Sequence, residues 1–319
     1  MLNDVLKCKM CSKPTLLSWR EISDVSPSPK VHDEYKNGLA MTKKIQHQNM
    51  LIGPSSPLTI IAGPCVLESQ TLCQDIAGTL KRICDDININ FVFKGSFDKA
   101  NRTSINSKRG PGIEEGLSIL ESIQSTLSVP VTTDIHEPCQ ASEIGSVVDI
   151  LQIPAFLCRQ TDLLVSAATT GKIVNVKKGQ FLSPHEMSHV INKLKEVNCE
   201  DIIITERGTF FGYSRLVNDF IGVGDMIDFG HPVCFDVTHS TQLPGAGKDQ
   251  TAGRPDRGAM LAKAATAAGV HALFIECHPK PSEGHSDAST MQPLDQMESI
   301  IKDCAAIYEL VNSTTGLPA

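Results

Sequence analysis

The sequence predicts a (β/α)8 barrel, because eight short runs of β-branched and apolar residues alternate with helical patterns after residue 58. Parallel strands that alternate with crossover helices close into a barrel when there are eight of them. A doubly wound open sheet is the alternative, but no Gly-x-Gly-x-x-Gly motif follows the first run. We expect strands at residues 59–62, 91–93, 129–133, 149–153, 172–176, 201–205, 233–237 and 272–275.

The segments between these strands show the apolar spacing of amphipathic helices. The crossover between the sixth and seventh strands, residues 211–231, has the weakest helical pattern, so we assign no helix bounds to it. We expect helices near residues 69–84, 112–127, 138–146, 161–170, 184–197, 256–268 and 293–312.

Residues 1–57 differ from the rest of the chain, because they are rich in Ser, Pro, Lys and Asn and lack sustained periodicity. We therefore predict a poorly ordered N-terminal extension, followed by the barrel over residues 58–319. Cys8 and Cys11 form a Cys-x-x-Cys motif, but no second pair follows at zinc-ribbon spacing, which disfavours a metal knuckle. An organelle transit peptide is an alternative, although the acidic residues and the single Arg20 argue against it.

The composition is that of a globular protein, with 41% hydrophobic and 20% charged residues. The net charge of -7 argues against a nucleic-acid or anionic-membrane surface, because both need a broad basic field. No apolar run reaches the roughly 18 uncharged residues that span a bilayer, and no secretory h-region follows the first lysines. We expect a cytoplasmic protein in which the 11 dispersed cysteines are reduced.

The stretch over residues 91–104 concentrates positive charge and neutral hydrogen-bond donors at the exit of the second predicted strand. Lysine supplies a point charge and arginine a planar fork, while hydroxyls and amides serve the remaining lone pairs of a phosphate or carboxylate. A solvated basic turn is the ordinary alternative for a single loop of this kind. The residues concerned are Lys94, Ser96, Lys99, Asn101, Arg102, Thr103 and Ser104.

Polar residues also follow the other predicted strands. The C-terminal ends of barrel strands meet at one face, which carries the active site in barrel enzymes. A lone Lys or Glu at a loop start is usually a surface residue, but polar groups at all eight strand ends favour a shared site. In strand order these residues are Cys65; Lys94; Asp134 and His136; Gln152; Lys177 and Lys178; Glu206 and Arg207; Asp236 and His239; and Glu276 and His278.

Two subsets of these residues differ in their chemistry. The cations of the second, fifth and sixth strands would neutralise a small substrate with several negative charges; they are Lys94, Lys99, Lys177 and Arg207. A mixed set of sulfur, nitrogen and oxygen donors suits a divalent transition metal such as Zn, Fe or Mn. Spacing alone leaves this metal site open, because no two donors are close in sequence and a lone cysteine is usually a core thiol. The donors are Cys65, His239, Glu276 and Asp287.

The loop over residues 243–255 follows the seventh strand and contains three glycines with little apolar content. A lid over the barrel mouth and a simple surface loop are both consistent with this composition.

Residues from about 58 to 312 closely resemble the 3-deoxy-D-manno-octulosonate 8-phosphate synthases. The motifs Phe-Lys-Gly-Ser-Phe-Asp-Lys-Ala-Asn-Arg-Thr-Ser (93–104), Thr-Thr-Asp-Ile-His-Glu (132–137), Gln-Ile-Pro-Ala-Phe-Leu-Cys-Arg-Gln-Thr-Asp (152–162), Asn-Val-Lys-Lys-Gly-Gln-Phe (175–181), Thr-Glu-Arg-Gly (205–208), Asp-Val-Thr-His-Ser-Thr-Gln-Leu-Pro-Gly (236–245) and Ser-Asp-Ala-Ser-Thr (286–290) carry the resemblance. It implies a (β/α)8 barrel that condenses phosphoenolpyruvate with arabinose 5-phosphate and water, for Kdo and lipopolysaccharide biosynthesis. It also implies a homotetramer.

The resemblance further implies the roles of individual residues. The phosphoenolpyruvate ligands would be Lys94, Ser96, Lys99, Gln152, Ala155, Lys177 and Arg207, and the arabinose 5-phosphate ligands Asn101, Arg102, Thr103, Asp134 and Arg159. Arg159 would reach the active site of a neighbouring subunit, and Thr103 replaces the usual Ser while keeping its hydroxyl. We expect Lys99, Lys177, His239 and Asp134 to act in catalysis.

The family divides into metal-dependent and metal-independent classes by the residue that follows Gly-Pro in the first loop, which is Cys in the former and Asn in the latter. This chain has Cys65, and His239, Glu276 and Asp287 are also in place, so the resemblance implies the metal-dependent class.

Three other functions remain as alternatives. A homologous synthase that uses erythrose 4-phosphate typically has Lys-Pro-Arg-Thr where this chain has Lys-Ala-Asn-Arg at 99–102. A sialic-acid-type synthase with an unphosphorylated acceptor would not need Arg102 and Arg159. A catalytically silent barrel with a partner-binding extension is disfavoured by polar residues at all eight strand ends.

Overall fold

The computed structural model describes residues 42–101, 105, 108–246 and 252–314. The predictions for Cys8, Cys11 and most of the N-terminal extension therefore lie outside the described residues, as do those for Arg102 and Thr103.

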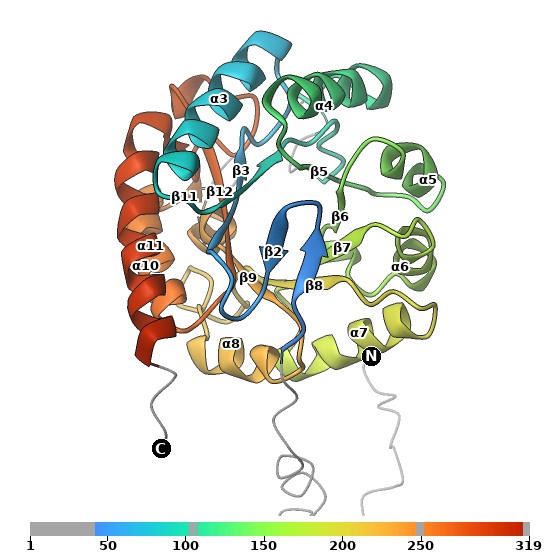
Figure 1. The fold of residues 1–319 in the computed structure, drawn as a ribbon, viewed down its shortest axis with the longest axis vertical. Coiled ribbons are helices and arrows are strands. Elements are labelled where there is room, and N and C mark those ends of the chain that lie inside the picture. The colour runs from blue at the N-terminus through green and yellow to red at the C-terminus, as the bar shows by residue number, and fades with distance from the viewer. Residues whose placement is uncertain (1–41, 102–104, 106–107, 247–251, 315–319) are drawn as a thin grey trace, which may run out of the picture. The chain divides into compact units, whose positions relative to one another are not determined.

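Eight parallel strands form a closed barrel, which confirms the predicted fold class (Figure 1). Strands β3 to β9 pair in chain order, and β12 pairs with both β9 and β3, which closes the ring. The short β13 (Gln292–Pro293) extends one edge of β12. The barrel strands are β3 (Thr59–Gly63), β4 (Asn90–Lys94), β5 (Val131–Asp134), β6 (Ile150–Ile153), β7 (Ile173–Lys177), β8 (Ile202–Glu206), β9 (Val233–Asp236) and β12 (Ala272–His278).

Helices surround the barrel, because each has one apolar face that packs on the strands (Figure 1). The unassigned crossover contains α8 (Phe220–Ile227), whose N-cap Asp219 accepts a hydrogen bond from Gly222 N. No helix among the described residues is long and apolar enough to cross a membrane. The other helices are α3 (Gln70–Asp86), α4 (Ile113–Leu127), α5 (Gln140–Gly145), α6 (Thr161–Ala168), α7 (Met187–Lys195), α9 (Val237–Ser240), α10 (Gly258–Ala267) and α11 (Met297–Thr314).

Short elements complete the fold. An antiparallel pair, β10 (Gln242–Leu243) and β11 (Ala252–Gly253), flanks the loop that follows β9. Single 3-10 turns precede three of the helices and help to explain why those helices begin later than predicted. The 3-10 elements are η2 (Ala155–Leu157), η3 (Pro184–Glu186), η4 (Pro255–Arg257), η5 (Pro281–Glu283) and η6 (Leu294–Gln296).

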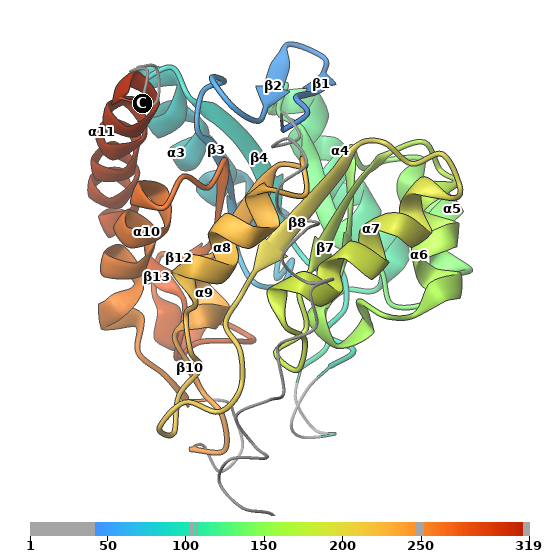
Figure 2. The ribbon, with the colours of Figure 1, turned by 90° about the horizontal axis from the view of Figure 1, so that it is seen from below.

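A β-hairpin closes the N-terminal end of the barrel, opposite the end that carries β10 (Figure 2). Its strands are β1 (Ile45–His47) and β2 (Met50–Ile52). Ile45 and Ile52 are fully buried and pack in one cluster with side chains of the barrel interior. The hairpin thus covers apolar side chains that the open end would otherwise expose to water.

The expectation that all of residues 1–57 lack order is wrong for this hairpin. Several hydrogen bonds join it and its following turn to the barrel. Asn90 Nδ2 donates to Leu51 O at 2.7 Å, Tyr308 OH donates to Gly53 O at 3.4 Å, and His47 Nε2 lies 2.8 Å from Asp149 Oδ1. Each strand has only three residues, so alternation between buried and exposed positions is too short to stand out in the sequence.

We expect replacement of Ile52 by Ala to lower the free energy of unfolding by about 2–5 kcal/mol, because a fully buried side chain would leave a cavity. Replacement of the neighbouring Leu51, which is 37% exposed, serves as the control and should cost less than about 1 kcal/mol. Urea unfolding measures both values. Equal losses for the two variants would show that the hairpin does not pack as described.

Candidate functional site

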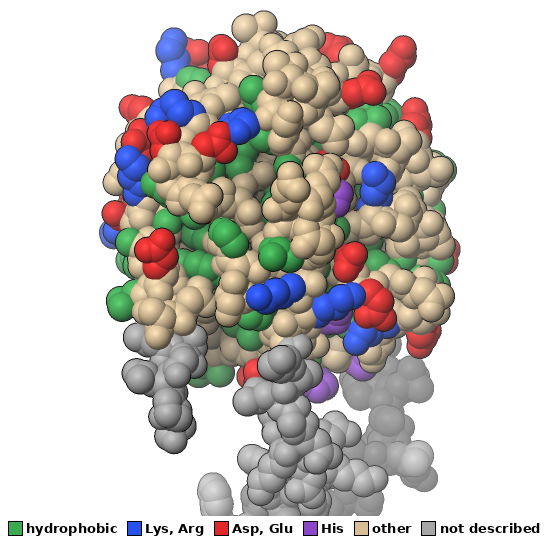
Figure 3. Space-filling model, viewed as in Figure 1, with side chains coloured by type: hydrophobic (Ala, Val, Ile, Leu, Met, Phe, Trp, Pro, Cys, Tyr) green, Lys and Arg blue, Asp and Glu red, His purple; other side chains and the backbone are tan. Residues whose placement is uncertain are grey.

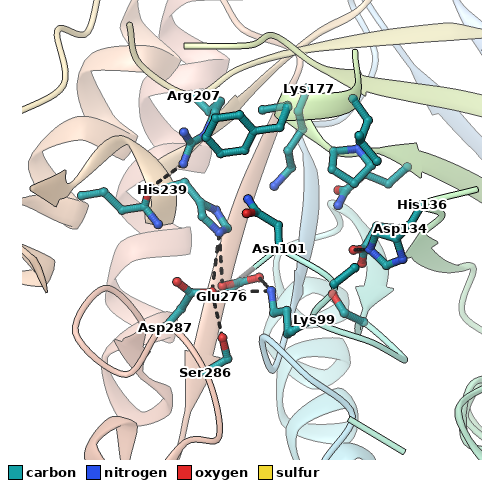
Figure 4. A pocket seen from close by; sticks show the side chains of 18 of the residues that line it. Lys99, Asn101, Asp134, His136, Lys177, Arg207, His239, Glu276, Ser286 and Asp287 are labelled. Atoms are coloured by element: carbon teal, nitrogen blue, oxygen red, sulfur yellow. Dashed lines mark hydrogen bonds and ion pairs between the residues drawn. The ribbon is translucent and has the colours of Figure 1, made fainter. Parts of the chain in front are cut away.

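A cavity of about 1010 Å³ opens at the C-terminal end of the barrel strands. Figure 4 shows members of both predicted sets facing it, with Asp134 and His136 across the cavity from Asp287. The labelled members of the two sets are Lys99, Lys177, Arg207, His239, Glu276 and Asp287. On the opposite face of the barrel, acidic and basic side chains are interspersed (Figure 3). Of the predicted site residues, the cavity is lined by Lys94, Ser96, Lys99, Asn101, Asp134, Gln152, Ala155, Lys177, Arg207, His239, Glu276 and Asp287.

Lys94 is buried at the end of β4, where three acceptors surround its ammonium group. Its Nζ lies 2.8 Å from Glu276 Oε1, 2.9 Å from Ser96 Oγ and 3.0 Å from Cys65 O. Charged side chains are rarely buried without such partners, so these contacts explain how a lysine is held beneath the cavity.

Lys177 and Asp236 form a second buried ion pair across β7 and β9, with 2.6 Å between Nζ and Oδ2. The ammonium also lies 3.5 Å from the centroid of the Phe274 ring, a cation–π contact. Burial lowers the pKa of Lys177, and the negative charge of Asp236 opposes this effect. Asp236 and the Phe274 ring thus favour the charged form that an anionic ligand requires.

Arg207 follows β8 and is oriented by Gln242, whose Oε1 accepts a hydrogen bond of 2.7 Å from Nη2. Its Nη1 is buried without a hydrogen-bond partner among the described residues, and the same holds for Gln152 Oε1. Buried polar atoms are normally paired, so these two atoms in the cavity wall are suited to bind a ligand.

The predicted donor set converges beside the cations. One ligand atom each from Cys65, Glu276 and Asp287 lies within 4.8 Å of the other two. His239 Nε2 lies 3.9 Å from Glu276 Oε2 and 3.9 Å from Asp287 Oδ2, so the fourth predicted donor also faces the cluster. Glu276 Oε2 is buried and lacks a hydrogen-bond partner among the described residues.

The protonation states of this cluster follow from its burial and its neighbours. Burial raises the pKa of the Cys65 thiol, and Asp287 and Glu276 raise it further, so Sγ donates a hydrogen bond of 2.9 Å to Asp287 Oδ2. Burial also raises the pKa of Asp287 and Glu276, but the charges of Lys99, Lys94 and His239 outweigh it, so both carboxyls have lowered pKa values.

Asp236 sets the orientation of His239 as well as pairing with Lys177. It caps the one-turn helix α9, and its Oδ2 lies 2.8 Å from His239 Nδ1. A carboxylate only accepts, so Nδ1 donates, and Nε2 is the ring atom that faces Glu276 and Asp287, where its lone pair would serve as a metal ligand whenever the ring is neutral. Asp236 was predicted at a strand end without a role in the site. Its position three residues before His239 was the available signal.

Asp134 and His136 form a further pair at the end of β5, with 2.9 Å between Oδ2 and Nε2. Burial raises the pKa of Asp134, but His136, Lys94 and Lys99 lower it by more, so the pKa lies well below its ordinary value. Burial lowers the pKa of His136, but Asp134 raises it above 6.5. Asp134 Oδ1 remains without a hydrogen-bond partner among the described residues. His136 was predicted at the same strand end but was given no role in the site, although it lies two residues after Asp134.

Arg159 does not line this cavity. It borders a separate hollow of about 500 Å³ beside α7, where Lys193 Nζ donates to Arg159 O at 3.1 Å. The structure therefore leaves its predicted contact with a neighbouring active site untested.

The fold and the site define a (β/α)8-barrel protein with a cavity lined by buried cations beside a cluster of metal-type donors. Residues 40–311 match the model of the DAHP synthetase I family, and the chain belongs to this family. It is similar to proteins named 2-dehydro-3-deoxyphosphooctonate aldolase. The relative from Protochlamydia amoebophila is 48% identical over 84% of this chain and 98% of its own length. The relatives from Synechococcus sp. (49%) and Fusobacterium nucleatum (48%) align over 84% of this chain and over 94% and 96% of their own lengths.

We expect Asp134→Asn to lower the pKa of His136, because the variant loses the charge that opposes the effect of burial. The pair stabilises the fold where His136 is protonated, and this contribution is lost as the pH rises through the raised His136 pKa. NMR titration of the ring measures the shift. Asp149→Asn, at the other end of the barrel, is the control and should leave the His136 titration unchanged. An unshifted pKa in Asp134→Asn would contradict the assignment.

Proposed function

We propose that the chain condenses phosphoenolpyruvate with D-arabinose 5-phosphate and water to give 3-deoxy-D-manno-octulosonate 8-phosphate and phosphate, in Kdo and lipopolysaccharide biosynthesis. The observation that carries this proposal is the convergence of buried cations and metal-type donors on one cavity. The chain is 48–49% identical to proteins named 2-dehydro-3-deoxyphosphooctonate aldolase. This identity supports arabinose 5-phosphate, and not erythrose 4-phosphate, as the acceptor.

Phosphoenolpyruvate would bind at the cations, with its phosphate and carboxylate at Lys94, Lys99, Lys177 and Arg207. The free Nη1 of Arg207 supports this assignment, because a guanidinium binds two oxygens of one phosphate or carboxylate. Gln152, Ser96 and Ala155 would complete the wall of this subsite.

Arabinose 5-phosphate would bind across the cavity, at Asn101 and Asp134. The resemblance adds Arg102 and Thr103, which follow Asn101 in the sequence, as further ligands of the sugar phosphate. Asp134 stays ionised because its pKa is lowered, so Oδ1 would accept a hydrogen bond from a sugar hydroxyl or the reacting water.

We also propose a homotetramer in which Arg159 binds the sugar phosphate in a neighbouring subunit. Exposed aromatic side chains near the barrel mouth support an interface between copies, since apolar groups of this size are usually covered. These residues are Phe156, Phe181, Phe211 and Tyr213.

The donor set fits a divalent transition metal, because Cys65, His239, Glu276 and Asp287 offer a thiol, an imidazole and two carboxylates. The unpartnered Glu276 Oε2 supports this fit. A bound Zn, Fe or Mn ion would polarise a water or an aldehyde oxygen.

We also propose that the protein functions in the cytoplasm, where its described cysteines would stay reduced.

In the proposed reaction, C3 of phosphoenolpyruvate forms a bond to the aldehyde carbon, and the aldehyde oxygen takes up a proton. Water adds to C2 and loses a proton. The C2–O bond to phosphate then breaks, phosphate leaves with the electron pair and takes up the proton of the C2 hydroxyl, and C2 becomes a ketone. Lys99, Lys177 and Arg207 would hold the anionic groups and stabilise their charge throughout, with Asp134 positioning the water and His239 in the donor set.

We expect the purified full-length protein, stripped of metal, to consume phosphoenolpyruvate only after Mn²⁺ or Zn²⁺ is restored, and only with arabinose 5-phosphate. Phosphate release and mass spectrometry of the product measure the reaction, with erythrose 4-phosphate in parallel. Turnover with erythrose 4-phosphate alone would assign the other acceptor. Full turnover without metal would give the donor set a structural role.

A further inference from the structure

We propose that Glu68 is a positioning residue that holds the β12–β13 loop, residues 279–291, so that Asp287 faces Cys65. This inference rests on the metal site proposed above. Glu68 lies in the loop after β3, three residues beyond Cys65, and its side chain is only 12% exposed.

Glu68 binds both the backbone and the ring of His285, two residues before Asp287. Its Oε1 accepts a hydrogen bond of 2.8 Å from His285 N, and its Oε2 lies 3.4 Å from His285 Nε2. A hydrogen bond from a backbone N–H to a carboxylate is among the stronger ones in proteins, so this contact fixes the path of the main chain.

Glu68 also faces the start of the loop. His278, the last residue of β12, places its buried Nε2 3.9 Å from Glu68 Oε1. That Nε2 lacks a hydrogen-bond partner among the described residues, and its ring position is set by a contact of 2.7 Å between Nδ1 and Lys280 O. One carboxylate therefore lies between two histidines that bracket the first half of the loop.

Asp287 needs such support because its backbone is in the left-handed region, with φ of +50°. This conformation is unfavourable for a residue with a Cβ unless the surroundings hold it. On the C-terminal side, Thr290 N and Met291 N donate to Asp287 O at 2.9 and 3.1 Å. On the N-terminal side, Glu68 provides the corresponding restraint through His285.

Glu68 acts on the metal-type donors and not on the cations that come from β7 and β8. Lys177, Arg207 and Gln152 come from β7, β8 and β6, and no described contact joins them to Glu68. Loss of the Glu68 contacts should therefore displace Asp287 while leaving Lys177, Arg207 and Gln152 in place.

The experiment compares full-length wild type with Glu68→Ala, Glu68→Gln and the control Glu283→Ala. Glu283 lies in the same loop, but its exposed carboxylate contacts only Lys280, at 3.3 Å, among the described ion pairs. Each metal-stripped protein is titrated with Mn²⁺ and Zn²⁺ against a chromogenic chelator, and with phosphoenolpyruvate by calorimetry. Hydrogen exchange over residues 279–291 reports directly on the restraint of the loop.

We expect Glu68→Ala to bind both metals about 10–100-fold more weakly, the loss typical for residues that orient metal ligands. Exchange in the loop should be faster, while phosphoenolpyruvate affinity should be weakened by no more than about twofold relative to wild type. Glu283→Ala should match wild type in all three measurements. Glu68→Gln keeps an acceptor for His285 N and should show a smaller loss.

Wild-type metal affinity in Glu68→Ala would overturn the inference, as would equal losses of metal and phosphoenolpyruvate affinity, which indicate general unfolding. If Glu68→Ala does not fold, Glu68→Gln decides: unchanged metal affinity and unchanged exchange would overturn the proposal. Failure of the wild type itself to bind metal would overturn the metal site, and this inference with it.

Discussion

The buried ion pair between Lys94 and Glu276 is the interaction on which the site depends. Its atoms are 2.8 Å apart, and the two side chains are 2% and 0% exposed. Either charge alone would be costly in the barrel, by about 3–5 kcal/mol once its partner is removed. Thr238 Oγ1, which accepts from Glu276 N at 2.7 Å, further fixes the glutamate. Because each charge neutralises the other, a lysine of the cation set and a carboxylate of the donor set can both lie buried at the base of the cavity.

Glu276 connects the two sets of the site, the cations and the metal-type donors, because its carboxylate contacts members of both. Glu276 Oε1 faces Lys94, whereas Oε2 faces His239. Lys99 Nζ lies 3.5 Å from Asp287 and 3.9 Å from Glu276, so the carboxylates draw it away from an anionic ligand. Asp236 makes a second connection, since it binds both Lys177 and His239. A change of charge in the donor set must therefore affect Lys94, Lys99 and Lys177.

The barrel and the convergence of its strand-end residues could be predicted, because parallel strands carry their C-terminal residues to one face whatever the side chains do. Side-chain contacts could not be predicted in this way. Nothing in the sequence shows that Asp236 joins Lys177 to His239 or that the Phe274 ring lies beneath Lys177. The hairpin over Ile45–Ile52 escaped notice because its strands are too short for periodicity. Arg159 was predicted to reach the active site of a neighbouring subunit. In the single chain it lies outside the cavity at the barrel mouth, so this prediction stays untested.

The most direct test of this account is the affinity for phosphoenolpyruvate, measured by calorimetry on metal-stripped protein and on the same protein saturated with Mn²⁺. A divalent ion at Cys65, His239, Glu276 and Asp287 would neutralise the carboxylates that now face Lys99 and Lys94. The account predicts tighter binding of phosphoenolpyruvate when the metal is present and, by linkage, tighter binding of metal when phosphoenolpyruvate is present. Equal or weaker affinity in the presence of metal would contradict a shared site.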